Sequence, residues 1–318
     1  MTALSAPSAL LPRRVVLVGN PHSGHVRDGM ERARAAILRE GLQIVETVRM
    51  RELGRLRAWV DRPEGERPLI VAAGGDGTIG AVCDYVADTG AILGIVPLGT
   101  SNDIARSFDI PMRIEDAVHL FTTGKVATAD LGCYVGEDGE RHHFAHAAAM
   151  GIDVVFSRLA TRESWRKRLG RFTYIVAGAV ALRDRAPFTC ELRLGDQGDR
   201  TVRMRLLHLS IINAPVFGGP LGLRLAGSSV DDRRLDVLAI EDAPLPRLLA
   251  TMIPVLFMAR PRVGGVRLYH VRRLHVHVEQ PLDVGLDGEV AGRLPSDFAL
   301  APESLRVVTG RGFEDMDD

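Results

Sequence analysis

Short apolar runs alternate with segments of helical periodicity over the first 125 residues. Patterns typical of buried strands occur at residues 15–18, 44–48, 69–72 and 92–96. Apolar side chains recur at the spacing of a helix face at residues 30–38, 53–60, 79–86 and 114–121. Strands that alternate with helices in this way predict a doubly wound α/β domain built on a parallel sheet.

The pattern changes after about residue 130, where shorter segments of alternating polar and apolar residues begin. These segments lie at residues 189–194, 203–212, 235–240 and 274–278, with glycine- and proline-containing turns between them. One helix is expected near residues 169–182. The pattern predicts an antiparallel sandwich or barrel, with the α/β domain over residues 13–128 and this second domain over residues 129–299.

Three polar, glycine-rich loops follow strands of the predicted parallel sheet. The carboxyl ends of such strands are where these sheets bind ligands. One loop consists of Gly74, Gly75, Asp76, Gly77 and Thr78. Its glycines allow backbone N–H groups to face an anion, and the helix that begins there adds its positive dipole end. Asp76 would then need a metal ion or a proton-transfer role. The alternative is an ordinary strand–helix turn in which Asp76 caps the helix, but the three loops together favour a phosphate site.

The other two loops offer hydrogen-bonding groups at the same predicted edge. The first consists of Asn20, Pro21, His22, Ser23 and Gly24, and the last of Gly99, Thr100, Ser101, Asn102 and Asp103. Thr100 and Asp103 also have the spacing of a capping box that opens a helix reaching Phe108. Both interpretations of the last loop can hold together.

The composition excludes several kinds of chemistry. The 40 basic residues balance 40 acidic ones, and only Lys125 and Lys167 are lysine, so the other 38 are arginine. Neither lysine lies in a Walker A loop or in the strand motif of a protein kinase, and Lys167 lies in a basic run that does not suit a Schiff base. Zero net charge argues against general nucleic-acid binding. Coding by a GC-rich genome is the simplest source of the arginine excess.

The three cysteines, at positions 83, 133 and 190, lack CxxC spacing. They suit a reducing cytoplasm, and we expect a cytoplasmic protein. The longest apolar stretch, residues 248–259, is too short to span a bilayer.

Taken together, the three loops and two later motifs resemble the diacylglycerol-kinase catalytic-domain family. These are bacterial soluble lipid kinases related to sphingosine kinases and, more distantly, to NAD kinases. The later motifs are Leu235-Asp236-Val237 and Leu286-Asp287-Gly288-Glu289, and the resemblance covers residues 13 to about 310. It implies an α/β nucleotide-binding domain to which the chain end, residues 300–312, returns. It also implies a lipid-binding β-sandwich, an active site in the cleft between the two, and ATP-dependent phosphorylation of a lipid hydroxyl with Mg²⁺.

The resemblance also implies roles for individual residues. Glu289 matches the proton acceptor, and Asp76 and Asp287 are assigned with it to catalysis. The implied nucleotide-binding residues are Asn20, Pro21, His22, Ser23, Gly24, Gly74, Gly75, Asp76, Gly77, Thr78, Gly99, Thr100, Asn102 and Asp103. The implied metal site consists of Ser229, Asp232 and Arg234, partly through main-chain carbonyls. Glycine loops, a carboxylate and magnesium suffice for phosphoryl transfer without a catalytic lysine, because this chemistry depends on positioning and charge neutralisation.

Some positions depart from the family pattern. Gly80 and Ala81 replace an Asn-Glu pair near the nucleotide, and Arg49 replaces a threonine that touches it. Arg233 replaces a glycine beside the metal site, and residues 146–151 replace a stretch of small residues. These changes could alter the nucleotide pose, tighten the lipid entrance or mark a degenerate enzyme.

A basic segment at residues 158–171 lies beside apolar residues 172–180. It is either a solvated helix leading into the core or a surface that attracts anionic headgroups. A lipid kinase needs peripheral contact with a membrane, and a homodimer is compatible with the sequence. The nearby His142, His143 and His146 lack adjacent carboxylate or cysteine partners, which argues against a zinc site.

Three hypotheses follow. The first is a lipid kinase that acts on diacylglycerol or a related long-chain alcohol. The second is an NAD-kinase-like enzyme with a soluble substrate, and the third is a catalytically weak homologue that binds lipid or nucleotide. The loop motifs favour the first.

Overall fold

The chain folds into two units, as seen in a computed structural model. The first contains Met1–Leu131, Ala214–Asp232 and Pro302–Asp318, and the second contains Gly132–Asn213 and Arg233–Ala301. The structure describes residues 11–20, 28–136, 139–151, 186–195, 200–217, 222–225, 227–244, 246–248 and 265–314. The predicted helix at 169–182, the basic segment at 158–171 and the first ten residues lie outside this range.

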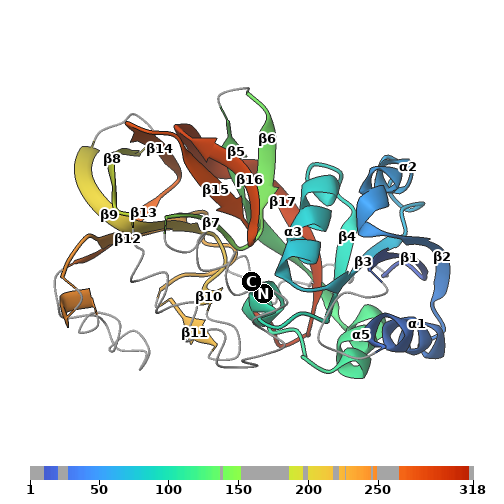
Figure 1. Ribbon diagram of the computed structural model, residues 1–318. Helices are drawn as coiled ribbons and strands as arrows, with labels where there is room; N and C mark the ends of the chain where they lie inside the picture. The colour runs from blue at the N-terminus through green and yellow to red at the C-terminus, as the bar shows by residue number, and fades with distance from the viewer. Residues whose placement is uncertain are drawn as a thin grey trace, which may run out of the picture. The chain divides into compact units, whose positions relative to one another are not determined.

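A parallel sheet forms the centre of the first unit (Figure 1). Its strands are β1 (Arg14–Gly19), β2 (Gln43–Val48), β3 (Leu69–Gly74) and β4 (Ile92–Pro97), in the order β2-β1-β3-β4. Arg306 and Val307 of β17 (Ser296–Thr309) extend it in parallel beyond β4. Every residue of β3 and β4 is buried, because helices cover both faces of a doubly wound sheet.

Helices α1 (Gly29–Arg39) and α5 (Ile114–Thr123) pack against each other, and their apolar side chains share one core cluster with β1 and β3. Helix α3 (Asp76–Val86) packs on β3 and β4 and contacts α2 (Arg57–Val60) and the 3₁₀ helix η1 (Met50–Leu56). Helix α4 (Asp103–Ser107) follows β4, and the short strands β10 (Val216–Phe217) and β11 (Leu223–Arg224) complete the described part of the unit. The doubly wound α/β fold is therefore confirmed.

The prediction of one helix around residues 53–60 was wrong in detail. The segment instead forms η1 and then a single turn of α-helix, with a non-helical backbone at Glu52. Gly54 lies in the middle of the segment, and glycine weakens a regular helix by about 1 kcal/mol relative to alanine.

The second unit is an antiparallel β-sandwich (Figure 1). This is one of the two folds that the sequence pattern allowed, and the one that the family resemblance implied. Its longest strand, β9, pairs with β7, β8 and β12, and the buried faces of these strands enclose one apolar core. The strands are β6 (Arg141–Phe144), β7 (Ala147–Gly151), β8 (Phe188–Leu194), β9 (Arg200–Ile212), β12 (Leu235–Glu241), β13 (Val266–Val271), β14 (Arg273–Val278), β15 (Leu282–Leu286) and β16 (Glu289–Leu294), with the end of β5 (Lys125–Val135) and the start of β17. Strand β16 pairs with β15, and β15 with β7.

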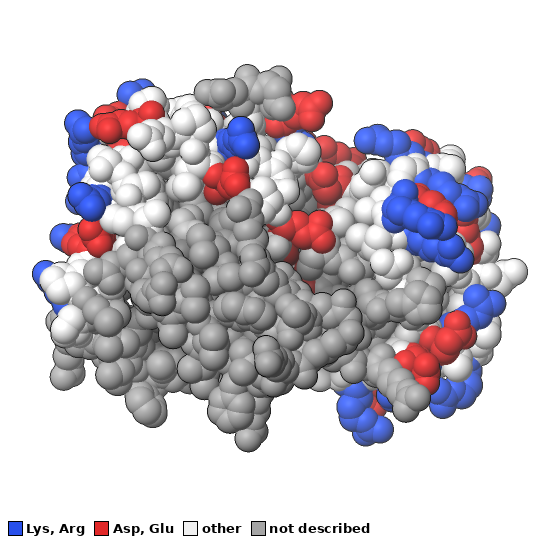
Figure 2. Space-filling model, viewed as in Figure 1, with Lys and Arg blue, Asp and Glu red and all other residues white. Residues whose placement is uncertain are grey.

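Basic and acidic side chains alternate over the described surface drawn in Figure 2. Several form exposed ion pairs, such as Arg32 with Glu115 and Arg203 with Glu279. Each unit therefore carries charged side chains of both signs. Among the described residues, no helix is long and apolar enough to cross a membrane.

Candidate functional site

Two of the predicted phosphate loops pack directly on each other at the carboxyl edge of the parallel sheet. A Cβ atom built on Gly99 would lie 2.5 Å from the Cα of Gly75 and would clash with it, and one built on Gly75 would lie 3.1 Å from the Cα of Gly99, which is tight. The backbone N–H of Leu98 donates to the carbonyl oxygen of Gly74 at 2.8 Å. The ends of β3 and β4 therefore bring the backbones of the two loops into direct contact.

Asp76 links the same two loops. Its Oδ1 accepts a hydrogen bond from the backbone N–H of Ile104 at 2.9 Å, in the first turn of α4. Asp76 is itself the first residue of α3, whose N-cap is Gly75. The aspartate thus caps a helix, but the helix is α4 rather than its own.

The capping box expected for Thr100 and Asp103 is not formed. The N-cap of α4 is Asn102, which has a left-handed backbone (φ 52°) and makes no side-chain cap. Its side chain instead bonds back to Gly99, accepting from the backbone N–H at 2.9 Å and donating to the carbonyl oxygen at 3.0 Å. Asn102 therefore closes the loop on itself, and the carboxylate of Asp76 does the capping.

A residue that the sequence analysis did not single out supports α4 from behind. The buried hydroxyl of Ser107 donates to the carbonyl oxygen of Asp103 at 2.9 Å and accepts from the backbone N–H of Val216 at 3.1 Å. The helix that follows the loop of residues 99–102 is in this way attached to the segment containing β10. A serine inside a short helix carries no distinctive sequence signal, which is why it was missed.

The remaining predicted nucleotide residues lie near the ends of these strands. Asn20 follows β1 directly, and Gly77 and Thr78 lie in the first turn of α3. Pro21, His22, Ser23 and Gly24 are outside the described residues.

The predicted metal ligands lie partly in each unit. Ser229 and Asp232 belong to the first unit, where the backbone N–H of Ser229 donates to Oδ2 of Asp232 at 3.3 Å and its hydroxyl donates to Asp231. Arg234 belongs to the second unit. Carboxylate, hydroxyl and carbonyl oxygens are the ligands that Mg²⁺ prefers. Ser229 and Asp232 offer such oxygens, whereas Arg234 could supply only its carbonyl oxygen. Arg233, where the family has glycine, adopts a left-handed backbone (φ 58°).

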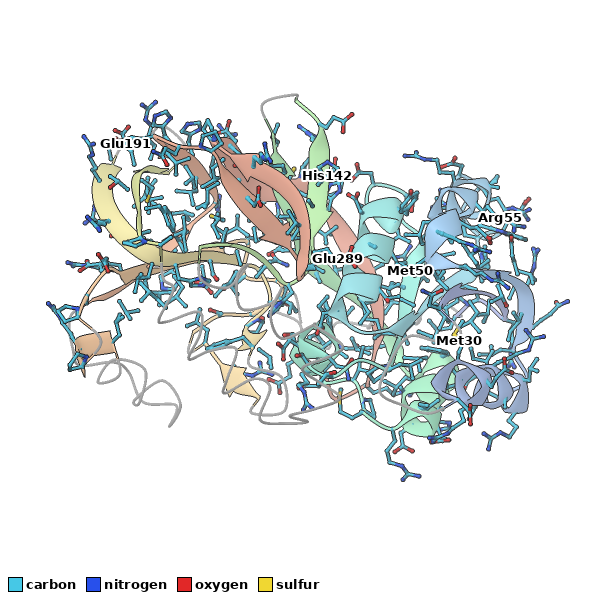
Figure 3. All side chains as sticks on the ribbon, viewed as in Figure 1. Met30, Met50, Arg55, His142, Glu191 and Glu289 are labelled. Atoms are coloured by element: carbon cyan, nitrogen blue, oxygen red, sulfur yellow. The ribbon has the colours of Figure 1, made fainter. Side chains whose placement is uncertain are left out.

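In the second unit, Glu289 and Asp287 lie on the hairpin that joins β15 to β16. Leu286 pairs with Glu289, and the two turn residues, Asp287 and Gly288, have φ angles of 47° and 92°. These values indicate a type I′ turn, which favours an Asp-Gly sequence. Glu289 is the first residue of β16, and its side chain is exposed within the unit (Figure 3).

Asp287 is buried, in contrast to Glu289. Its Oδ2 accepts from the backbone N–H of Ala145 at 2.9 Å, and its Oδ1 accepts from those of His146 and Ala147 at 2.9 and 3.0 Å. Burial raises the pKa of the Asp287 carboxyl, and His146 together with the three N–H donors opposes that rise. Residues 145–147 could not be predicted as the partners of Asp287 from the sequence, because they lie about 140 positions earlier in the chain.

The departures from the family pattern occupy distinct environments. Gly80 is buried in α3, Ala81 is half-buried, and Arg49 is exposed just beyond the carboxyl end of β2. Of the three histidines considered for a zinc site, His142 lies on β6 and His146 lies beyond the end of that strand.

Two family models match the chain. The model of the diacylglycerol kinase catalytic domain matches residues 14–134. The model of the YegS C-terminal NAD kinase beta sandwich-like domain matches residues 146–309. Together they span nearly all of both units.

Curated proteins resemble the chain along most of its length, and a solved structure shares its fold. A diacylglycerol kinase of Mycobacterium tuberculosis is 28% identical over 303 residues, covering 94% of this chain and 96% of that protein. A diacylglycerol kinase of Bacillus subtilis is 27% identical over 265 residues, covering 80% and 82%. The crystal structure of a diacylglycerol kinase from Bacillus anthracis str. Sterne superposes with a TM-score of 0.66 at 16% identity, covering 95% of this chain and 98% of that one, and shows the likeness of fold.

Proposed function

This chain belongs to the diacylglycerol kinase family, and from that premise we propose that it transfers the γ-phosphate of ATP to the hydroxyl of diacylglycerol or a related long-chain lipid. The contact between Gly75 and Gly99 is the observation that carries the proposal. The contact lies beside the start of α3, whose N-cap Gly75 has no side chain to bond the first-turn N–H groups, and we infer that these groups face a polyphosphate.

The loops of the first unit would hold the nucleotide. The backbone of residues 74–78 and 99–103, with Asn20, would contact the phosphates, and the start of α3 adds its positive dipole end. Such a cradle needs no lysine, which agrees with a chain that has only two. Bound Mg²⁺ would neutralise charge on the phosphates, and Asp76, Ser229 and Asp232 carry oxygen ligands suited to it.

Glu289 would accept the proton of the lipid hydroxyl as that oxygen bonds to the γ-phosphorus and the bond to the ADP oxygen breaks. A carboxylate can perform this step when it is placed within hydrogen-bond reach of the hydroxyl. Glu289 suits the role because its side chain is exposed. It directly follows the two-residue turn of Asp287 and Gly288. We also propose that the enzyme works at a membrane surface from the cytoplasm, since its substrate resides in the bilayer.

The test is Glu289→Gln, which preserves the shape of the side chain and removes its basicity. A general base contributes about 10²- to 10⁴-fold to rate, so we expect kcat to fall at least about 100-fold while the Kd for ATP stays within about twofold. Glu279→Gln is the matched control, because Glu279 is an exposed glutamate of the same unit paired with Arg203, and its kcat should not change. Equal loss of turnover and of ATP affinity in Glu289→Gln would refute the role of a base.

A further inference from the structure

The hairpin that carries Glu289 has a fixed tip. Leu286 and Glu289 face each other across a two-residue turn, so the backbone of Asp287 determines where Glu289 begins. Turns of this type have little freedom, because both central residues must keep positive φ angles. Any group that holds Asp287 therefore also holds the backbone of Glu289.

Asp287 is held by residues 145–147 through four hydrogen bonds. Three of their backbone N–H groups donate to its carboxylate, and its own N–H donates to the carbonyl oxygen of Ala147 at 2.9 Å. Only 6% of the residue is exposed. A carboxylate enclosed in this way is occupied by the protein backbone and has no open side from which to reach a substrate hydroxyl.

The platform formed by residues 145–147 is fixed in turn by Asn213. Its side-chain Nδ2 donates to the carbonyl oxygen of Ala145 at 2.9 Å, and its backbone N–H donates to that of His146 at 2.8 Å. The backbone N–H and C=O groups of residues 145–147 are thus all engaged by Asp287 and Asn213. The hairpin tip rests on a rigid support rather than on a mobile loop.

The other end of β16 is held by Tyr134. Its hydroxyl donates to the carbonyl oxygen of Arg293 at 2.8 Å and accepts from the backbone N–H of Arg293 at 2.9 Å. The ring of Tyr134 meets that of Phe298 edge-on, with 5.5 Å between centroids. Strand β16 lies at the end of the strand order, next to β15, and an edge strand has one side without a ladder partner. Tyr134 supplies a second attachment there.

We propose that Asp287 and Tyr134 are positioning residues that set the place of the Glu289 carboxylate, and that Asp287 is not a reacting group. This rests on the proposed function of Glu289. An Asn-Gly pair would form the same turn without burying a charge, whereas burying a carboxylate is costly unless it is fully hydrogen-bonded. The charge makes the three bonds to residues 145–147 stronger than neutral ones, which stiffens the tip that Glu289 follows.

The test compares Asp287→Asn and Tyr134→Phe with Asp283→Asn, a control on the same hairpin whose carboxylate pairs with Arg293 at the surface. Misplacing a reacting group by about 1 Å costs about 100-fold in rate. We expect Asp287→Asn to lower kcat about 10- to 100-fold and Tyr134→Phe to lower it about three- to tenfold. The KM for ATP should stay within about twofold in both, and Asp283→Asn should match the wild type.

The pH profile separates positioning from proton transfer. A base must be deprotonated to work, so kcat falls as the pH drops through its pKa. If Glu289 is the base, Asp287→Asn lowers the plateau but keeps the acid limb at the same pH, whereas Glu289→Gln removes the limb. Loss of the limb in Asp287→Asn would show that Asp287 accepts the proton. A wild-type kcat in Asp287→Asn or in Tyr134→Phe would overturn the positioning role of that residue.

Hydrogen exchange tests the support without relying on activity. The amides of Ala145, His146 and Ala147 should exchange slowly in the wild type and in Asp283→Asn, and at least tenfold faster in Asp287→Asn. Unchanged exchange in Asp287→Asn would overturn the inference even if the protein is a lipid kinase. If exchange is faster in Asp287→Asn but the wild type has no kinase activity, Asp287 still supports residues 145–147 and the proposed function of the protein is wrong. If Asp287→Asn does not fold, Tyr134→Phe carries the kinetic test alone.

Discussion

The carboxylate of Asp76 has a structural role in the fold and a proposed role in the chemistry. The sequence predicted it as a phosphate-loop residue or as the cap of the helix that follows it. In the structure its Oδ1 caps α4, which begins 27 residues later. Spacing along the chain predicts contacts within one turn of a helix, but it carries no information about which second loop a side chain will meet. The contact between Asp76 and Ile104 depends on the packing of the folded sheet, which places their two loops side by side.

The two roles of Asp76 can be separated by a pair of substitutions. Asp76→Asn retains an Oδ1 acceptor for Ile104 and loses the charge, so stability should change little while magnesium-dependent turnover is lost. Asp76→Ala should also lower the free energy of unfolding by about 1 kcal/mol, the usual worth of a cap. Chemical denaturation and ATP turnover at saturating Mg²⁺ measure the two effects. Normal turnover in Asp76→Asn would rule out a charge-dependent role.

At the scale of elements, periodicity predicted the strands and most helices of the first unit. Val15, Leu69 and Ile92 begin or lie in strands where the apolar runs placed them. The prediction failed at residues 53–60, where Gly54 interrupts a helical pattern, and at the start of α4, where Asn102 bonds to Gly99 instead of capping. In both cases local backbone preferences outweighed the spacing of apolar or polar residues.

The contact between the two glycine loops gives a prediction for an element. In Gly99→Ala the added methyl group would lie 2.5 Å from the Cα of Gly75, and overpacking of this kind costs about 1–3 kcal/mol. Because relief of this clash would displace the loop that we propose contacts ATP, we expect the Kd for ATP to rise at least about tenfold, which corresponds to about 1.4 kcal/mol of binding free energy. Gly54→Ala is the control, because a Cβ there meets nothing within 4 Å. Calorimetric titration with ATP measures both, and wild-type affinity in Gly99→Ala would contradict the proposed nucleotide cradle.

At the scale of the whole chain, the alternation of strands and helices followed by short alternating strands predicted both fold classes. Strand partners could not be predicted in the same way. Val284 of β15 pairs with Met150 of β7, and Tyr134 bonds to Arg293, although neither pair is marked by a local motif. Long-range pairing follows from how whole layers pack. The sequence therefore predicted Asp287 and Glu289 as one motif. It did not predict the hydrogen bonds from residues 145–147 to Asp287, which distinguish the proposed roles of the two residues.

If the chain is a lipid kinase, its ATP turnover depends on a lipid that carries a free hydroxyl. The full-length protein is incubated with ATP and Mg²⁺ in the presence of vesicles of an anionic phospholipid, with or without diacylglycerol, and separately with NAD. We predict that ATP is consumed and phosphatidic acid is formed only when diacylglycerol is present, and that Glu289→Gln suppresses both. Phosphorylation of NAD, or ATP binding without any lipid product, would show that the protein is not a lipid kinase.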